Sequence, residues 1–215
     1  MSMFRALLMA GGGSSVPTAG LLFHAPLAED LVDRVSGAAL EAAAGEVSFA
    51  DGAATLDHAR LSLPGAAFPG GDAPCTLACT VAPTDFGFDN SSWFSDMFGI
   101  GDSGDGNFRI FSGNPYKVGI HFGVGDVECE YGWDLSGETW TNLVATISPD
   151  GCVLYINGNA VASSDSTELA TADPAGLTVG GMFGVGWPLT SGKYKNLLLY
   201  DRILSPAEIA AIANL

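Results

Sequence analysis

Residues 152–158 read Cys-Val-Leu-Tyr-Ile-Asn-Gly, and this stretch decides the fold class. Asn-Gly after a strand-like run is the strongest short-range signal for a two-residue hairpin turn, because both residues tolerate a positive φ. Just upstream, residues 140–147 form another strand-like run that leads into the turn Pro149-Asp150-Gly151. The stretch therefore predicts consecutive antiparallel strands.

Similar short runs, separated by turn residues, recur from Gly20 onward. They cover residues 21–25, 46–49, 60–63, 75–81, 107–111, 117–122, 176–180 and 194–200. The 29 glycines fit many tight turns better than long helices. Strands at this spacing, without helical periods between them, predict an all-β sandwich or barrel.

One short C-terminal helix is predicted after Ser205. Ser205 can cap it, Pro206 suits the first helical position, and Glu208 completes a Ser-x-x-Glu capping box. Ile209 and Ile212 then form an apolar stripe, which predicts that the helix packs back onto the strands.

The first 19 residues are predicted to form an appendage. Residues 4–9 are apolar enough for a turn of helix, and residues 11–17 read Gly-Gly-Gly-Ser-Ser-Val-Pro, which is typical of a flexible linker. We therefore expect an N-terminal appendage over residues 1–19 and one folded domain over residues 20–215. An apolar segment on a linker predicts docking onto a partner, including a homo-oligomer formed through this segment. A frayed terminus is the alternative.

Acidic residues outnumber basic ones, 24 against 8, which gives a formal net charge of −16. This charge disfavours nucleic acids and anionic membrane surfaces as partners. No apolar run approaches the roughly 20 residues of a membrane span, and Gly11 interrupts the run that a classical signal peptide would need. A glycan or a protein surface remains as the expected partner, and an extracellular or virion-associated location fits both.

The four cysteines are Cys75, Cys79, Cys129 and Cys152. Cys75 and Cys79 lie four residues apart in a strand-like run, so about 13 Å separates them and they are too distant to bridge. Both alternate with polar residues beside Leu77, which indicates small buried side chains. Free thiols in the core are the preferred interpretation, and a cross-sheet disulfide is the alternative.

Several segments follow one another in an order that is typical of one family. They are LFHAPL (22–27) with DRVSG (33–37), CTLACTVAP (75–83), WTNLVA (140–145), LYING (154–158) and LYDRILSPAEI (199–209). Together they resemble the laminin-G-like jelly-roll family of the concanavalin A-like lectin/glucanase superfamily. The resemblance implies a two-layer antiparallel jelly-roll sandwich with a short C-terminal helix. It leaves the function open, because the family holds glycan-binding modules, adhesion domains, virion and tail proteins, and glycosidases.

The resemblance also bears on metals. Members that bind structural calcium use the Asp of the opening turn, here Asp33, and an acid in a late strand, where this chain has Lys195. Calcium takes six to eight oxygen ligands and a lysine would repel it. Asp33 is thus the metal candidate, Lys195 disfavours the calcium ion, and no other cofactor is expected. Trp140, at the start of the W-x-H-V-A strand, is expected in the core.

The remaining tryptophans lie beside Gly, Ser, Asp and Pro, which predicts that they occupy loops. A tryptophan on a loop either covers its own core or meets a partner, and an aromatic face can stack on a sugar ring while Asp or Asn binds the hydroxyls. The predicted ligand-binding residues are therefore Trp187, Trp133, Trp93, Tyr116 and Asn114. The alternative is that these rings plug the end of the sandwich.

A catalytic alternative rests on three acids. Asp126, Glu128 and Glu130 alternate, so a strand would place them on one face. The segment is similar to the E-x-D-x-E strand of jelly-roll glucanases, where two carboxylates act as nucleophile and acid. Here the order of residue types differs, and solvated carboxylates on an edge strand are preferred. No catalytic residue is predicted.

These observations predict a non-catalytic, lectin-like module that recognises carbohydrate through loop aromatics. A structural or adhesion protein of a phage tail or virion is the first alternative. The observation that supports it is the apolar N-terminal segment on its linker. A glycoside hydrolase is the third hypothesis.

Overall fold

The computed structural model describes residues 15–64, 73–85, 94–100, 108–113, 117–122, 126–132, 139–165, 176–181 and 191–215. The strands are β1 (Leu21–Ala25), β2 (Glu41–Ala50), β3 (Ala53–Pro64), β4 (Cys75–Asp85), β5 (Phe94–Ile100), β6 (Phe108–Gly113), β7 (Lys117–Phe122), β8 (Asp126–Gly132), β9 (Thr141–Ser148), β10 (Gly151–Ile156), β11 (Asn159–Ser164), β12 (Gly176–Val179) and β13 (Ser191–Tyr200). One short helix, α1 (Pro206–Ile212), follows them. The predicted class, mostly β with a short C-terminal helix, is confirmed.

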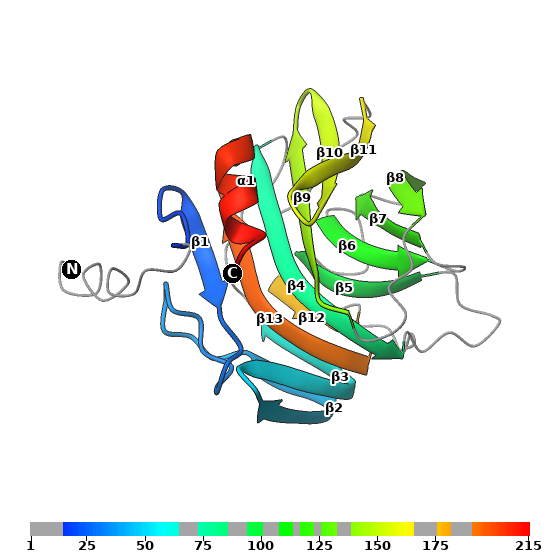
Figure 1. Cartoon of the computed structure of the whole chain (residues 1–215). Helices are drawn as coiled ribbons and strands as arrows, with labels where there is room; N and C mark the ends of the chain where they lie inside the picture. The colour runs from blue at the N-terminus through cyan, green and yellow to red at the C-terminus, as the bar shows by residue number, and fades with distance from the viewer. Residues whose placement is uncertain are drawn as a thin grey trace.

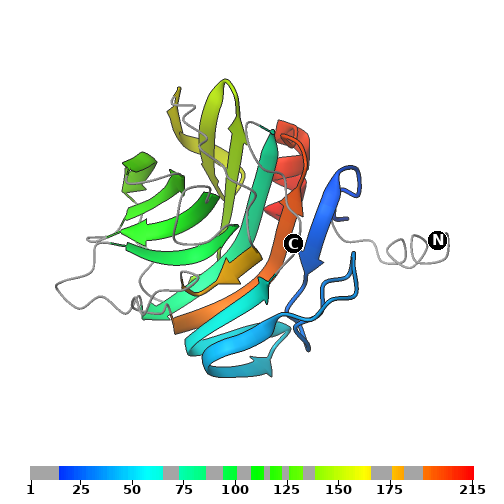
Figure 2. The same cartoon turned by 180° about the vertical axis from the view of Figure 1, so that it is seen from behind.

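The described strands pair into one antiparallel ladder in the order β11-β10-β9-β4-β13-β3-β12-β5-β6-β7-β8, with β1 on β13 and β2 on β3. The ladder curls strongly, as Figures 1 and 2 show from opposite sides. Its two ends meet where β11 contacts β8. The sheet therefore nearly closes around its core, and the continuous ladder does not by itself divide into two layers.

The hairpin that the sequence predicts at Asn157-Gly158 is confirmed. Asn157 and Gly158 join β10 to β11 with φ values of 49° and 79°, so both adopt the positive φ that a tight two-residue turn needs. Strand β2 begins at Glu41, five residues before the predicted run, and its side chains are mostly exposed. An exposed edge strand carries little apolar periodicity, which explains why the sequence pattern missed its first half.

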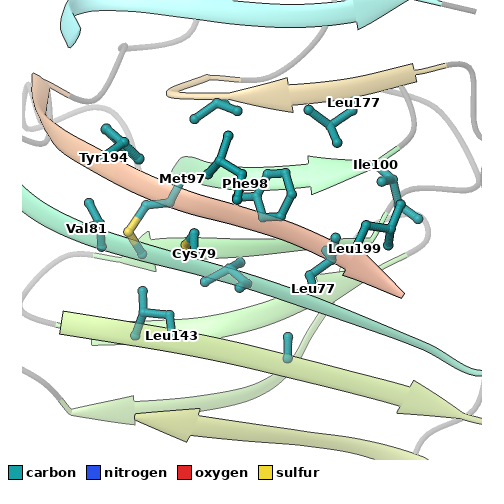
Figure 3. Close-up of a cluster of buried hydrophobic side chains, with 14 of the residues drawn as sticks. Leu77, Cys79, Val81, Met97, Phe98, Ile100, Leu143, Leu177, Tyr194 and Leu199 are labelled. Carbon is teal, nitrogen blue, oxygen red and sulfur yellow. The ribbon is translucent and has the colours of Figure 1, made fainter. Parts of the chain in front are cut away.

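The main core fills the inside of the curled sheet. Alternate residues of β4, Leu77, Cys79 and Val81, point inward and meet Met97 and Phe98 of β5 (Figure 3). All five side chains are fully buried. Because side chains alternate along a strand, the other residues of β4 point to the opposite face of the sheet and have different neighbours.

The cysteine prediction is confirmed for three residues. Cys75, Cys79 and Cys152 are buried thiols outside any disulfide, whereas the side chain of Cys129 lies outside the described part of the chain. Burial raises the pKa of Cys75 and of Cys79 to about 12. Both thiols therefore stay protonated and unreactive at neutral pH.

Helix α1 covers the outer face of β4 and β13 (Figure 1). The Ser205 side chain accepts a hydrogen bond from the main-chain N–H of Glu208, and Glu208 accepts one from the N–H of Ser205, so the predicted capping box is present. Ile209 and Ile212 are buried in a second apolar cluster with Tyr200 of β13. The helix thus leaves only part of this outer face open.

Arg202 ties both ends of the described chain together. Its guanidinium forms a two-pronged pair with Glu208, at 2.6 and 2.9 Å, and its Nε donates to the Ala19 carbonyl at 2.8 Å. Val16 packs against the second apolar cluster. The last residues of the predicted appendage therefore contact the domain, while Met1–Ser14, the segment predicted to form an oligomer contact, lies outside the described residues.

Candidate functional site

All five predicted ligand-binding residues fall on segments that the structure does not describe. They are Trp93, Asn114, Tyr116, Trp133 and Trp187. Their role stays a prediction, and the described surface has to be searched for its own candidates.

Asp33, the metal candidate, stabilises the turn that follows β1 by accepting hydrogen bonds. Its Oδ1 accepts the N–H groups of His24 (2.8 Å) and Val35 (3.0 Å), and its Oδ2 accepts the N–H (2.9 Å) and the hydroxyl of Ser36. These four hydrogen bonds account for a carboxylate that is almost fully buried. Within the described ranges, no group of three or more His, Cys, Asp or Glu side chains is arranged to hold a metal ion. A calcium ion at Asp33 therefore stays an untested hypothesis.

Asp57, His58 and Ser191 come together in a way that resembles a catalytic triad. Ser191 Oγ lies 3.0 Å from His58 Nδ1, and the same nitrogen lies 2.9 Å from Asp57 Oδ1. A proton relay needs the hydroxyl and the carboxylate on different ring nitrogens. Ser191 also accepts the N–H of His58, whose φ is 44°, so the cluster fixes a strained backbone position within β3, where the pairing with β2 is irregular. Its geometry is not that of a proton relay.

The three acids of the catalytic alternative lie on β8. Its pairing with β7 matches Cys129 to Ile120 but Val127 to His121, so the register skips Glu128. Such a bulge interrupts the alternation that was to place Asp126, Glu128 and Glu130 on one face. The backbone thus removes the regular spacing on which the comparison with glucanases depended.

Trp140 corrects one expectation outright. It was expected in the core, but its side chain is 39% exposed. Leu143 and Ala145 of β9 point into the core, so Asn142, of the opposite parity, points to the outer face. Trp140 directly precedes β9 with the same parity as Asn142, and its ring lies under Lys195 of that face. The alternation of residues 140–147 in the sequence therefore already indicated that Trp140 points away from the core.

A polar row crosses the sheet beside Trp140. Lys195 of β13 pairs with Thr80 of β4, and Thr80 pairs with Asn142 of β9. The Asn142 amide donates to the Thr80 hydroxyl at 3.1 Å, while its own Oδ1 is buried without a hydrogen-bond partner among the described residues. Because buried acceptors are normally satisfied, this oxygen is a place where a bound water molecule would add a hydrogen bond.

Two lysines complete the row. Tyr194 points into the core, so Lys193 and Lys195 point to the outer face, about 7 Å apart along the strand. The Lys195 ammonium lies 5.0 Å from the centre of the Trp140 ring and donates to the main-chain oxygen of Leu215 at 3.3 Å. We call Thr80, Trp140, Asn142, Lys193 and Lys195 the Trp140 face.

The Trp140 face is chemically distinct from its surroundings. An exposed indole is adjacent to hydroxyl, amide and ammonium groups, and aromatic rings of this kind are enriched where a protein meets a partner. The same lysine that was expected to exclude calcium from Asp33 here holds a ring in place by a cation–π contact. The face can therefore offer a flat apolar surface and hydrogen bonds to one ligand.

The fold defines a mostly β domain with one short helix. The chain belongs to the concanavalin A-like lectin/glucanases superfamily, because the laminin-G-type model of that superfamily matches residues 53–210. This confirms the family that the sequence motifs indicated. A comparison with the sequences of curated proteins finds no match.

Solved structures with the same fold include the Trypanosoma rangeli sialidase, with a TM-score of 0.71 and 19% identity over 93% of this chain and 33% of the sialidase. Domain 4 of AbnA, a GH43 extracellular arabinanase from Geobacillus stearothermophilus, in complex with arabinotriose, has a TM-score of 0.67 and 20% identity over 92% of this chain and 100% of that domain. The binding domain of botulinum neurotoxin DC, in complex with rat synaptotagmin II, has a TM-score of 0.69 and 12% identity over 91% and 51% of the two chains.

At these identities the likeness shows the fold alone, and the chain spans about a third of the length of the sialidases. The neighbours nevertheless correct the predicted function. The predicted function was a non-catalytic, lectin-like carbohydrate-binding module, with a phage-tail or virion protein and then a glycoside hydrolase as alternatives. The structural neighbours contradict it, because they are sialidases and a domain of an arabinanase. Within the described residues, no helix has the length and apolar character needed to cross a bilayer.

Proposed function

We propose that the chain works in glycan processing, as a domain that holds substrate for a glycoside hydrolase, with the Trp140 face as its contact surface. In this proposal the nearly closed sheet is the two-layer jelly-roll sandwich of the superfamily. The arabinanase domain supports the assignment, because that domain is matched over its whole length and is in complex with arabinotriose. The sialidases support it as enzymes that carry a similar fold within a longer chain.

The single observation that carries the proposal is the exposed indole of Trp140 with the Lys195 ammonium 5.0 Å from its ring centre. Phe49 and Tyr131 are similarly exposed, so exposure alone does not single out Trp140. Burial of an aromatic ring is strongly favourable, so leaving 39% of it in water is costly unless a partner covers it. Lys195 fixes the ring from one side, which lowers the conformational entropy that a ligand would have to remove. The hydrophobic faces of sugar rings suit such a fixed indole, and the neighbouring Lys193 and Lys195 can donate to sugar hydroxyls.

Cleavage is assigned to a hydrolase that accompanies this domain. The register of β8 skips Glu128, which interrupts the alternation that would align Asp126, Glu128 and Glu130 on one face. Retaining and inverting hydrolases both need two carboxyl groups at a fixed separation across the scissile bond. The loop aromatics Trp93, Trp133 and Trp187 stay predicted as additional sugar contacts.

The binding test compares Trp140→Ala and Trp140→Phe with the wild type on a panel of arabinan, galactan, xylan and sialylated glycans. We expect the alanine variant to bind its glycan about tenfold more weakly, which corresponds to ~1.4 kcal/mol, and the phenylalanine variant to keep part of the affinity. Because Trp140 is exposed, melting temperatures should change little. Equal affinity of wild type and Trp140→Ala would contradict the proposal.

A second test concerns catalysis. The chain alone should release no reducing sugar from any polysaccharide that it binds, and Glu128→Gln should change nothing. Turnover by the wild type that Glu128→Gln abolishes would instead make the chain itself the hydrolase.

A further inference from the structure

We propose that the Trp140 face selects sugars that carry a carboxylate, with Lys193 and Lys195 binding the acid while the indole contacts the sugar ring. This inference rests on the proposed function and names the substrate class of the same site.

The distribution of positive charge carries the inference. The whole chain has 8 basic residues against 24 acidic ones, yet two lysines lie on one strand within this face. The guanidinium groups of Arg34, Arg109 and Arg202 each pair with a carboxylate. Among the described residues, no Asp or Glu side chain forms an ion pair with Lys193 or Lys195.

Two ammonium groups that form no ion pair with an Asp or Glu side chain of the described residues, on the same face as an exposed ring, form a two-point recognition surface. An ammonium has three N–H donors, and Lys195 gives one of them to the Leu215 main-chain oxygen, so donors remain for a ligand. A charge-assisted hydrogen bond to a carboxylate is roughly twice as strong as a neutral one. A uronic or sialic acid carries its carboxylate at the edge of the sugar ring, so one ligand can offer a carboxylate to a lysine and an apolar ring face to the indole.

The net charge of −16 does not oppose this selection. At physiological ionic strength the Debye length is about 8 Å, so distant surface carboxylates are largely screened, whereas groups in contact are not. A sugar acid brings one charge per residue, unlike nucleic acid with its dense phosphates. At this face the attraction between the lysines and a ligand carboxylate therefore outweighs the screened repulsion from the negative charge of the whole chain.

The experiment uses an array of uronic-acid and sialic-acid oligosaccharides, each beside its methyl ester, which keeps the sugar and removes the charge. Wild type is compared with Lys193→Glu, Lys195→Gln and the charge-conserving Lys193→Arg. Lys117→Glu on β7 is the matched control, because it changes the net charge by the same amount as Lys193→Glu. Melting temperatures verify that each variant is folded.

We expect the wild type and Lys193→Arg to bind the free acids about tenfold or more tightly than the esters. Lys193→Glu and Lys195→Gln should lose this preference, while Lys117→Glu should keep it. Equal or tighter binding of the esters by the wild type, or an acid preference that survives in Lys193→Glu, would overturn the inference and leave the proposed function standing. No binding of any glycan on the array or on the panel above would overturn the proposed function itself.

Discussion

His24 and Asp33 lie together after β1 but are satisfied very differently. The His24 N–H donates to the Asp33 carboxylate at 2.8 Å, whereas the imidazole is buried and neither ring nitrogen has a hydrogen-bond partner among the described residues. Burial lowers the pKa of His24 to about 4, against the raising effect of Asp33 and together with the lowering effect of Arg34. The ring is thus held in its neutral form in the folded protein.

The buried imidazole makes stability depend on pH. The unfolded chain takes up a proton at His24 near pH 6.5, and the folded chain only near pH 4, so between these values the unfolded state binds more protons. The free energy of unfolding should therefore fall as the pH is lowered across this window, by roughly 3 kcal/mol in total. Urea unfolding at pH 7, 5.5 and 4.5 measures this dependence.

His24→Leu is the matching variant, because it removes the titrating group without removing a hydrogen bond of the ring. It should lose the part of the pH dependence that belongs to this window. An unchanged slope in His24→Leu would show that other groups cause it.

The C-terminal helix shows how an element is fixed at its first turn. The capping box was readable from Ser205 and Glu208, because both partners lie within four residues of each other. The pairing of Glu208 with Arg202 could not be predicted from the sequence, because it depends on where β13 ends and how the chain turns into the helix. The capping-box residues thus predict where the helix starts, whereas the ion pair that fixes it to Arg202 depends on the tertiary structure.

Glu208 variants separate these two contributions. Hydrogen bonds from the Arg202 side chain, and then from Ser205, lower the pKa of Glu208 to about 2. Glu208→Gln keeps a capping side chain but loses the ion pair, and Glu208→Ala loses both. We expect Glu208→Ala to cost ~1–2 kcal/mol, or about 2–8 °C in melting temperature, and Glu208→Gln to cost less, because the pair is partly exposed.

The pH dependence gives an independent check on the ion pair. The folded pKa lies below the usual value of 4.5, so the stability from this carboxylate is complete above pH 4.5 and is lost as the pH falls toward 2. Glu208→Gln should lack this acid-dependent component. Equal acid sensitivity in both proteins would contradict the assigned role of the pair.

The strands also show where sequence patterns stop being informative. Buried strands such as β4 and β9 alternate or are continuously apolar, and they were predicted near their observed positions. Strand β2 is mostly exposed, and the skipped residue on β8 is a property of pairing rather than of composition. Trp140 was misassigned because the family motif took precedence over the parity of its own strand.

At the scale of the whole molecule, short antiparallel strands and ordered motifs were enough to predict the family, which the match over residues 53–210 confirms. The candidate site was not predicted. Lys195, Thr80 and Asn142 lie far apart in the sequence, and only the order β13-β4-β9 makes them neighbours. Spacing along the chain contains no record of that order.

Function is the least readable property of this chain, because one fold carries many activities. The structural neighbours, which include sialidases and an arabinanase domain, contradict the predicted lectin-like module. The geometry adds a candidate contact surface, a sheet face that carries an exposed ring and two lysines, while the loop aromatics stay a prediction.

The measurement that tests this account most directly is an NMR titration of the 15N-labelled chain with a glycan identified on the panel or array. The four tryptophan indole N–H signals, assigned through Trp140→Phe, report separately on the sheet face and on the loops. We expect the Trp140 indole and the amides of Thr80, Asn142 and Lys195 to shift together along one saturation curve. Shifts confined to Trp93, Trp133 and Trp187, with Trp140 unmoved, would contradict the account and place the ligand on the loops.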